Sequence, residues 1–147
     1  SFRGVAHRLQ LVRELRGVRF YDDSIATAPE RVLAALRCFD RPIVLLCGGR
    51  DKKLPWDEAA AEIGRRCRHV ALFGEMAGMV RGKLGAARVG PDRISVHATL
   101  AQAVREAADL ARPGDIVLLS PGGTSYDAYK DFAERGNQFT EIVTELH

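Results

Sequence analysis

The sequence has little of what defines several protein classes. Its apolar runs, such as residues 43–47, are far shorter than the ~20 residues of a membrane-spanning helix. The three cysteines, Cys38, Cys47 and Cys67, form no Cys-x-x-Cys pair and have no histidine pair at metal-ligand spacing. The sequence therefore supports neither a metal site nor a disulfide framework. We expect reduced thiols in a cytoplasmic protein.

Lysine is also scarce. Of the 22 basic residues, four are Lys and 18 are Arg, and the net charge is only +3. The arginines are spread among acidic residues along the whole chain, whereas a nucleic-acid-binding stripe would group basic residues with aromatic ones. We therefore expect neither a nucleic-acid nor a membrane partner.

The remaining composition, 46% hydrophobic and 28% charged, is typical of one globular domain covering residues 1–147. Short apolar runs predict strands at residues 18–21, 43–47, 69–73, 94–96 and 115–119. Helices are predicted from Pro29, at 55–66, at 76–84, after Thr99, and at 126–135 and 137–146, the last two separated by Gly136. This alternation is typical of an α/β, Rossmann-like fold: a mostly parallel sheet of five or six strands with helices on both faces.

Three polar turns follow predicted strands, at residues 22–27, 48–53 and 120–125. Ligands of parallel sheets bind beyond the carboxyl ends of the strands, so these turns are the candidate site. Their hydroxyls, ammonium groups and free backbone N–H groups suit a small anion with more than one carboxylate or phosphate. Two simpler interpretations stay open: Asp23 and Thr27 could only cap a helix, and Lys52 and Lys53 could only be solvated.

The same turns lack the parts of a complete enzyme. No Ser-His-Asp or Cys-His arrangement and no general base can be argued from the sequence, and the last turn lacks the Gly-Lys-Ser/Thr ending of a phosphate-binding P-loop. This inventory favours a binding domain, or one half of a shared active site.

In order along the chain, the sequence contains His7-Arg8, a block from Phe20 to Glu30, Leu45 to Lys53, Leu118 to Asp127, and Phe-Ala-Glu-Arg-Gly at 132–136. This series resembles the C-terminal domain of the Mur ligases, closest to those that join D-glutamate to UDP-N-acetylmuramoyl-L-alanine. The resemblance implies an ATP-dependent, cytoplasmic, monomeric ligase of peptidoglycan precursor synthesis that works through an acyl phosphate. It implies ATP and Mg²⁺ in the whole enzyme, and neither bound by this domain alone. Residues 1–16 would lead in from a central ATPase domain, and the domain alone would be inactive.

The resemblance also assigns residues. The glutamate-holding positions match Thr27, Lys52, Ser125 and the backbone around Phe132, with Lys53 as the alternative to Lys52. The nucleotide-facing positions match Arg8 and Asp23, and His7 lies at the hinge.

Three departures from the family pattern leave the glutamate enantiomer open: Ile25 stands where Lys is frequent, Ala28 where Asn is common, and residues 122–124 where small Ala/Cys runs are usual. Two other functions remain as alternatives. One is the corresponding domain of another acid–amino-acid ligase, either L-glutamate-adding or similar to folylpolyglutamate synthetase. The other is a stand-alone flavodoxin-like binding module.

Overall fold

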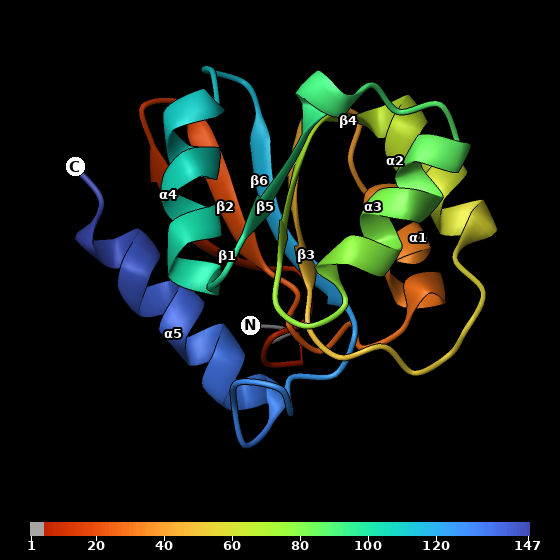
Figure 1. Cartoon of the computed structure of the whole chain (residues 1–147). Coiled ribbons are helices and arrows are strands. Elements are labelled where there is room, and N and C mark those ends of the chain that lie inside the picture. Colours follow the sequence, from red (N-terminus) through yellow and green to blue (C-terminus); the bar gives the residue numbers. More distant parts are fainter. Residues whose placement is uncertain (1–4) are drawn as a thin grey trace.

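A six-stranded sheet runs through the centre of the computed structural model, which describes residues 5–147 (Figure 1). The strands are β1 (Gln10–Leu15), β2 (Val18–Asp22), β3 (Ile43–Gly48), β4 (Cys67–Phe73), β5 (Ile94–His97) and β6 (Ile116–Gly122). Their order is β1-β2-β6-β3-β4-β5, and every neighbouring pair except β1–β2 is parallel. The predicted mostly parallel α/β sheet is confirmed.

Helices cover both faces of this sheet (Figure 1). The helices are α1 (Pro29–Leu36), α2 (Asp57–Arg66), α3 (Ala77–Ala86), α4 (Leu100–Leu110) and α5 (Phe132–Glu145), with a short 3₁₀ turn at Pro91–Arg93. One core forms under α1, α2 and α3 around Trp56 and Leu45, and the other under α4 and α5 around Phe139 and Leu46. Because β3 and β6 are buried on both faces, their sequences are continuous apolar runs.

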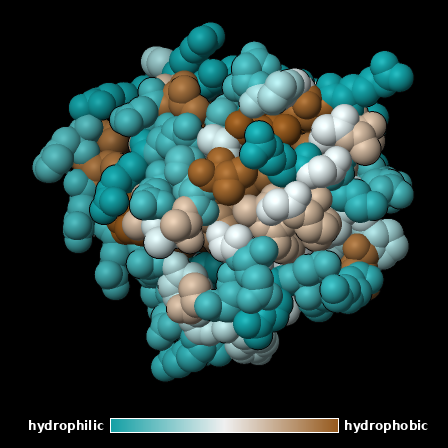
Figure 2. Space-filling view, in the orientation of Figure 1, coloured by the Kyte–Doolittle hydropathy of each residue, from teal (hydrophilic) through white to brown (hydrophobic). Residues whose placement is uncertain are grey.

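The surface facing the viewer in Figure 1 carries mainly hydrophilic side chains, with apolar ones in small groups between them (Figure 2). Among residues 5–147, no helix combines the length and apolarity needed to cross a membrane.

The first strand corrects the sequence prediction, which placed no strand before residue 18. Strand β1 pairs antiparallel with β2 through a two-residue turn, in which Arg16 and Gly17 have φ of 54° and 79°. It is an edge strand whose side chains are exposed or half-buried, so its sequence lacks the apolar run that reveals an inner strand. Residues 1–4 of the expected lead-in lie outside the described part of the chain.

The last helix corrects a second prediction. Residues 126–131 form turns instead of a helix, and α5 runs without a break through Gly136. The helix begins where the side chain of Asp131 accepts a hydrogen bond from the Glu134 N–H at 2.8 Å. Gly136 is therefore not a helix stop, and its role lies in the packing described below.

Arginines from other elements cap the carboxyl ends of three helices. The bonds run from Arg93 to the Gly64 and Cys67 carbonyls at α2, from Arg68 to Leu110 at α4, and from Arg13 to Val143, Thr144 and Leu146 at α5. A guanidinium has five N–H donors, so one side chain can satisfy several of the carbonyls that a helix end leaves unpaired. Its charge also opposes the negative end of the helix dipole. These contacts account for part of the preference for Arg over Lys.

We predict that Arg13→Met, which keeps an apolar stem and removes the guanidinium, lowers the free energy of unfolding by about 1–2 kcal/mol because the α5 carbonyls lose their donor. Urea unfolding followed by circular dichroism measures the change. The control is Arg105→Met, since Arg105 is exposed on α4 and makes no side-chain hydrogen bond within residues 5–147. Equal losses in both variants would contradict a capping role.

Candidate functional site

The three polar loops meet at one edge of the sheet. They are the β2–α1 loop (residues 23–28), the β3–α2 loop (49–56) and the β6–α5 loop (123–131), here called the site loops, and they leave neighbouring strands (Figure 1). The Gly122 N–H donates to the Ala26 carbonyl at 2.8 Å. Arg50 and Thr124 exchange two backbone hydrogen bonds, at 2.9 and 3.0 Å. The predicted meeting of these loops is confirmed.

The topology of the sheet makes this edge the expected place for a ligand. Strand β6 leads to α5 on one face of the sheet, whereas its neighbours β2 and β3 lead to α1 and α2 on the other face (Figure 1). The loop that leaves β6 therefore runs to one face of the sheet, while the loops that leave the strands on either side of it run to the other face. Ligands of open α/β sheets bind at such switch points.

Arg135 on α5 ties two of the three site loops together from inside. Its side chain is fully buried. Nε and Nη2 donate to Oγ and O of Ser24 at 2.9 and 2.8 Å, and Nη1 donates to the Gly123 carbonyl at 3.1 Å. In the third loop, a Cβ on Gly49 would lie only 3.0 Å from Nη1. Burial lowers the pKa of Arg135 to about 10, so it remains charged at neutral pH. The sequence marks Arg135 only as part of the Phe-Ala-Glu-Arg-Gly block at 132–136, and nothing in it indicates that this arginine is buried.

Ser24 passes this connection on to the start of α5. An arginine N–H can only donate, so the Ser24 hydroxyl accepts from Arg135 and donates to the Phe132 carbonyl at 2.7 Å. The Phe132 carbonyl is thereby occupied inside the protein. Phe132 is also the first residue of α5, where N–H groups have no partner within the helix and favour an anion.

His7 anchors the entry of the chain to the same region. Its Nδ1 lies 2.6 Å from Oδ2 of Asp22, which is 1% exposed, and its ring packs edge-on against Phe132 at a centroid distance of 6.1 Å. The Ile25 N–H donates to the His7 carbonyl at 3.2 Å. Gly136 faces this pair: a Cβ there would collide with Nδ1 of His7 and lie 2.7 Å from Oδ2 of Asp22. The close approach explains a glycine inside a helix.

Asp23 is held within the protein. It is 4% exposed, and its two oxygens accept from the Ser120 hydroxyl at 2.8 Å and the Leu9 N–H at 3.1 Å. Burial raises the pKa of Asp23 to about 6 even though both hydrogen bonds oppose the shift. Arg8 is exposed and lines a hollow of about 100 Å³ together with Asp23. The structure thus brings together the two residues assigned to the nucleotide.

Thr27, Lys52 and Ser125 lie one on each site loop, and they differ in exposure. Thr27 is half-buried, Lys52 is exposed, and Ser125 is 2% exposed. The N-cap of α1 is Ala28, which provides no side-chain hydrogen bond, so the structure does not support a capping role for Asp23 or Thr27. Lys53 is also exposed, with φ of 61°, and its N–H donates to the Asp51 side chain.

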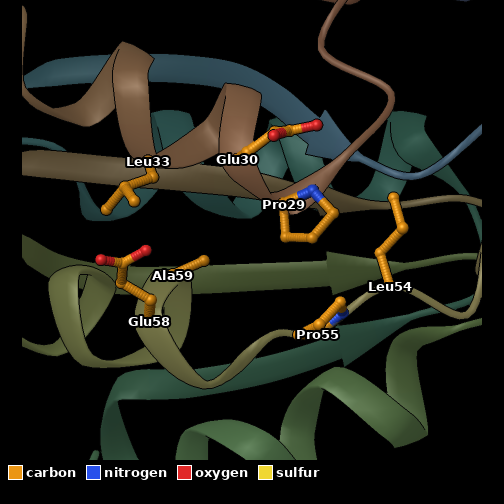
Figure 3. Close-up of a pocket in the computed structure, with 7 residues that line it drawn as sticks. All are labelled: Pro29, Glu30, Leu33, Leu54, Pro55, Glu58 and Ala59. Atoms are coloured by element: carbon orange, nitrogen blue, oxygen red, sulfur yellow. The ribbon is translucent and has the colours of Figure 1, made fainter.

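A hollow of about 240 Å³ lies next to the site loops, between the first turns of α1 and α2 (Figure 3). Its walls include Leu33 and Leu54, and the carboxylates of Glu30 and Glu58 also line it. Two negative charges make it a poor receptor for a dicarboxylate. Within residues 5–147, no three His, Cys, Asp or Glu side chains are grouped so as to hold a metal ion.

Comparison with known proteins decides the family. Residues 7–123 match the model of the Mur ligase, glutamate ligase domain. The chain belongs to this family. It is 43% identical over 149 residues to the UDP-N-acetylmuramoylalanine–D-glutamate ligase of Clostridium botulinum, covering 99% of this chain and 32% of that protein. The chain therefore spans about one third of the length of its curated relatives.

Solved structures agree on the fold. A murein peptide ligase from Psychrobacter arcticus matches 100% of this chain and 32% of its own length, with a TM-score of 0.65 and 15% identity. A Mycobacterium tuberculosis folylpolyglutamate synthase, described as complexed with ADP and AMPPCP, matches 95% of this chain and 32% of its own, with a TM-score of 0.63 and 19% identity.

We predict that Gly136→Ala destabilises the fold by about 1–3 kcal/mol, although alanine is the better helix former, because its methyl group would displace His7 and Asp22. Gly82→Ala on α3 is the matched control: a Cβ there meets no atom within 4 Å, so helix propensity should stabilise it by about 1 kcal/mol. Urea unfolding measures both. Stabilisation by both substitutions would show that the Gly136 contact is unimportant.

The buried carboxyl of Asp23 should make the stability of the fold depend on pH. A carboxyl pKa raised from 3.8 to about 6 means that, between these values, the folded chain holds a proton that the unfolded chain has lost. The free energy of unfolding therefore falls as the pH rises through this window. In Asp23→Asn, Oδ1 can still accept from the Leu9 N–H, and Nδ2 can donate to the Ser120 hydroxyl in place of the bond that Ser120 now donates, all without a charge. The variant should therefore remove this fall and be more stable above pH 6, by up to about 3 kcal/mol. Unfolding curves at pH 4–8 test this against the exposed control Asp109→Asn, and equal pH profiles for wild type and Asp23→Asn would refute it.

Proposed function

We propose that this chain is the glutamate-binding domain of an ATP-dependent ligase that joins D-glutamate to UDP-N-acetylmuramoyl-L-alanine in peptidoglycan precursor synthesis. The observation that carries the proposal is the convergence of the site loops at the switch point of the sheet: Arg135 bonds the β2–α1 loop to the β6–α5 loop, and the backbone pair Arg50–Thr124 joins the β3–α2 loop to them. Each joined loop carries one of the residues matched to glutamate: Thr27, Lys52 or Ser125. The printed names of the sequence relatives support the choice of substrate.

The chemistry of these residues suits a dicarboxylic amino acid. The Lys52 ammonium and the hydroxyls of Ser125 and Thr27 are hydrogen-bond donors for carboxylates, worth about 1.5–3 kcal/mol each where a charge is involved. Several donors spread over three loops favour a ligand with two carboxylates over one with a single acid group.

The remaining steps of the proposed reaction belong to the rest of a cytoplasmic, monomeric enzyme. ATP, with Mg²⁺, would phosphorylate the carboxylate of UDP-N-acetylmuramoyl-L-alanine, and the glutamate amine would attack the acyl phosphate, forming the amide and releasing phosphate. This chain would present the glutamate amine. Its Arg8 and the buried Asp23 would lie on the side of the active site that faces the nucleotide. His7, anchored to Asp22, would set the direction in which the preceding chain enters. This domain alone would not catalyse the reaction.

The alternatives differ in their support. The likeness to folylpolyglutamate synthase is at 19% identity and concerns the fold, whereas the relatives at 37–46% identity carry the D-glutamate ligase name. The family match over residues 7–123 argues against an unrelated flavodoxin-like module. We therefore prefer D-glutamate to L-glutamate as the ligand.

The proposal predicts that D-glutamate, titrated to saturation into the ¹⁵N-labelled chain, shifts amide resonances in the three site loops, and that L-glutamate binds more weakly. Lys52→Ala should raise the Kd for D-glutamate at least tenfold, or about 1.4 kcal/mol, because a donor to a carboxylate is lost. Lys53→Ala, one residue away with the same charge change, should alter the Kd less than twofold. Two results would contradict the proposal: amide shifts that lie outside the site loops, or an equal rise of the Kd for D-glutamate in both variants, which would mean that Lys52 makes no specific contact with the ligand.

A further inference from the structure

Another hollow lies at the opposite edge of the sheet, where β3 and β4 begin. It has a volume of about 520 Å³ and lies between the turn after α1 and the end of α2. Four arginines, Arg41, Arg65, Arg66 and Arg68, line it, together with apolar atoms of Phe39 and Pro42. We call it the arginine hollow. The site loops lie at the other ends of these strands, so the arginine hollow is separate from the proposed glutamate site.

Two buried carboxylates hold three of these guanidinium groups in place. Glu62, 5% exposed, accepts from Nη2 and Nε of Arg65 at 2.5 and 3.2 Å and from Nε of Arg66. Asp115, also 5% exposed, accepts from Nη2 and Nε of Arg68 at 2.6 and 3.1 Å. Arginines fixed in this way have already lost much of the side-chain freedom that a ligand would otherwise have to restrict.

These contacts leave many donors unused. Each guanidinium has five N–H groups. The Nη1 groups of Arg65 and Arg68 have no hydrogen-bond partner within residues 5–147, and Arg41 makes neither a hydrogen bond nor an ion pair with that part of the chain. The arginine hollow is therefore lined by donors that the fold itself does not use, some on the held arginines Arg65 and Arg68 and the others on Arg41.

Positive charge also exceeds negative charge here. Arg37, 4.0 Å from Glu62, adds a fifth guanidinium to the four that line the hollow. Among the described residues that line the hollow or form ion pairs with its arginines, three are carboxylates: Glu62 and Asp115 behind the arginines, and Asp40 on the wall. An anion carrying two or more negative charges would balance the difference.

Helix capping explains only part of this set. Arg66 donates to the Phe39 carbonyl after α1, and Arg68 donates to the Leu110 carbonyl at the end of α4. Arg41 and Arg65 bond to no carbonyl within residues 5–147. The ion pair with Glu62 gives Arg65 a structural role, whereas a structural role leaves unexplained why Arg41 lines the same hollow.

We propose that the arginine hollow binds a small polyphosphate anion, with two or more linked phosphoryl groups. Guanidinium groups bind phosphate oxygens through paired N–H donors, and several of them around one space match several linked phosphoryl groups. The volume lies within the ~300–1,000 Å³ typical of small-ligand sites. Phe39 and Pro42 offer apolar contact to an organic part of such a ligand. Because the site lies away from the site loops, the proposal does not rest on the glutamate function.

Inorganic pyrophosphate is the probe, titrated into the ¹⁵N-labelled chain at 20 and 150 mM salt. We expect saturable shifts at residues 39–42 and 65–68 that persist at the higher salt. Arg41→Gln should weaken binding at least tenfold, and it should fold, because Arg41 has no partner in the described chain. Arg105→Gln, on the other face of the sheet, makes the same charge change and should weaken binding less than twofold.

Two results would overturn the proposal: equal weakening by both variants, which would indicate general attraction to a basic protein, or the absence of shifts at residues 39–42 and 65–68. A parallel titration with ADP identifies the source of the phosphates. Binding at least tenfold tighter than pyrophosphate assigns a nucleoside diphosphate, with its base against Phe39, and equal binding assigns free polyphosphate. D-Glutamate titration of Arg41→Gln tests the glutamate site independently, since its shifts belong to the opposite edge.

Discussion

The buried guanidinium of Arg135 is the constraint on which the candidate site depends. A charge taken out of water is costly unless its donors are satisfied, and no carboxylate within residues 5–147 forms an ion pair with it. Its partners are Ser24 and the Gly123 carbonyl, and Gly49 leaves room for it in the third loop. A shift of the β2–α1 loop or the β6–α5 loop would leave donors of this buried charge unpaired, so these two loops cannot easily move apart.

The two edges of the sheet use basic residues in different ways. At the carboxyl edge, the site loops carry hydroxyls, glycines and the exposed Lys52 and Lys53, and Arg135 is buried beneath them. At the amino edge, arginines close helix ends and line a hollow. Arg is used instead of Lys where one side chain bonds several carbonyls or is held in a fixed orientation, because a single ammonium group does this less well. The small net charge of +3 conceals this division.

Sequence patterns predicted what local burial determines. Strands β3 and β6 were recognisable because both their faces are apolar, and the meeting of the site loops followed from the parallel sheet. Strand β1 was not predicted, because an exposed edge strand carries no such apolar run. Gly136 was misread because a helix stop and a close contact both favour glycine, and only the position of His7 separates them. The role of Arg135 could not be predicted, because it depends on contacts with Ser24 and Gly123 across the fold.

The position of β6 has a consequence for how the chain acquires its structure during translation. Among the described strands, β6 alone pairs with both the β1–β2 hairpin and the β3–β4–β5 group, and it is the last of them to leave the ribosome. Until residues 116–122 emerge, no strand pairing joins the hairpin to the other group, and each has an open edge. Contacts this distant in sequence form slowly, so the early fragments would need protection from association before the final strand arrives.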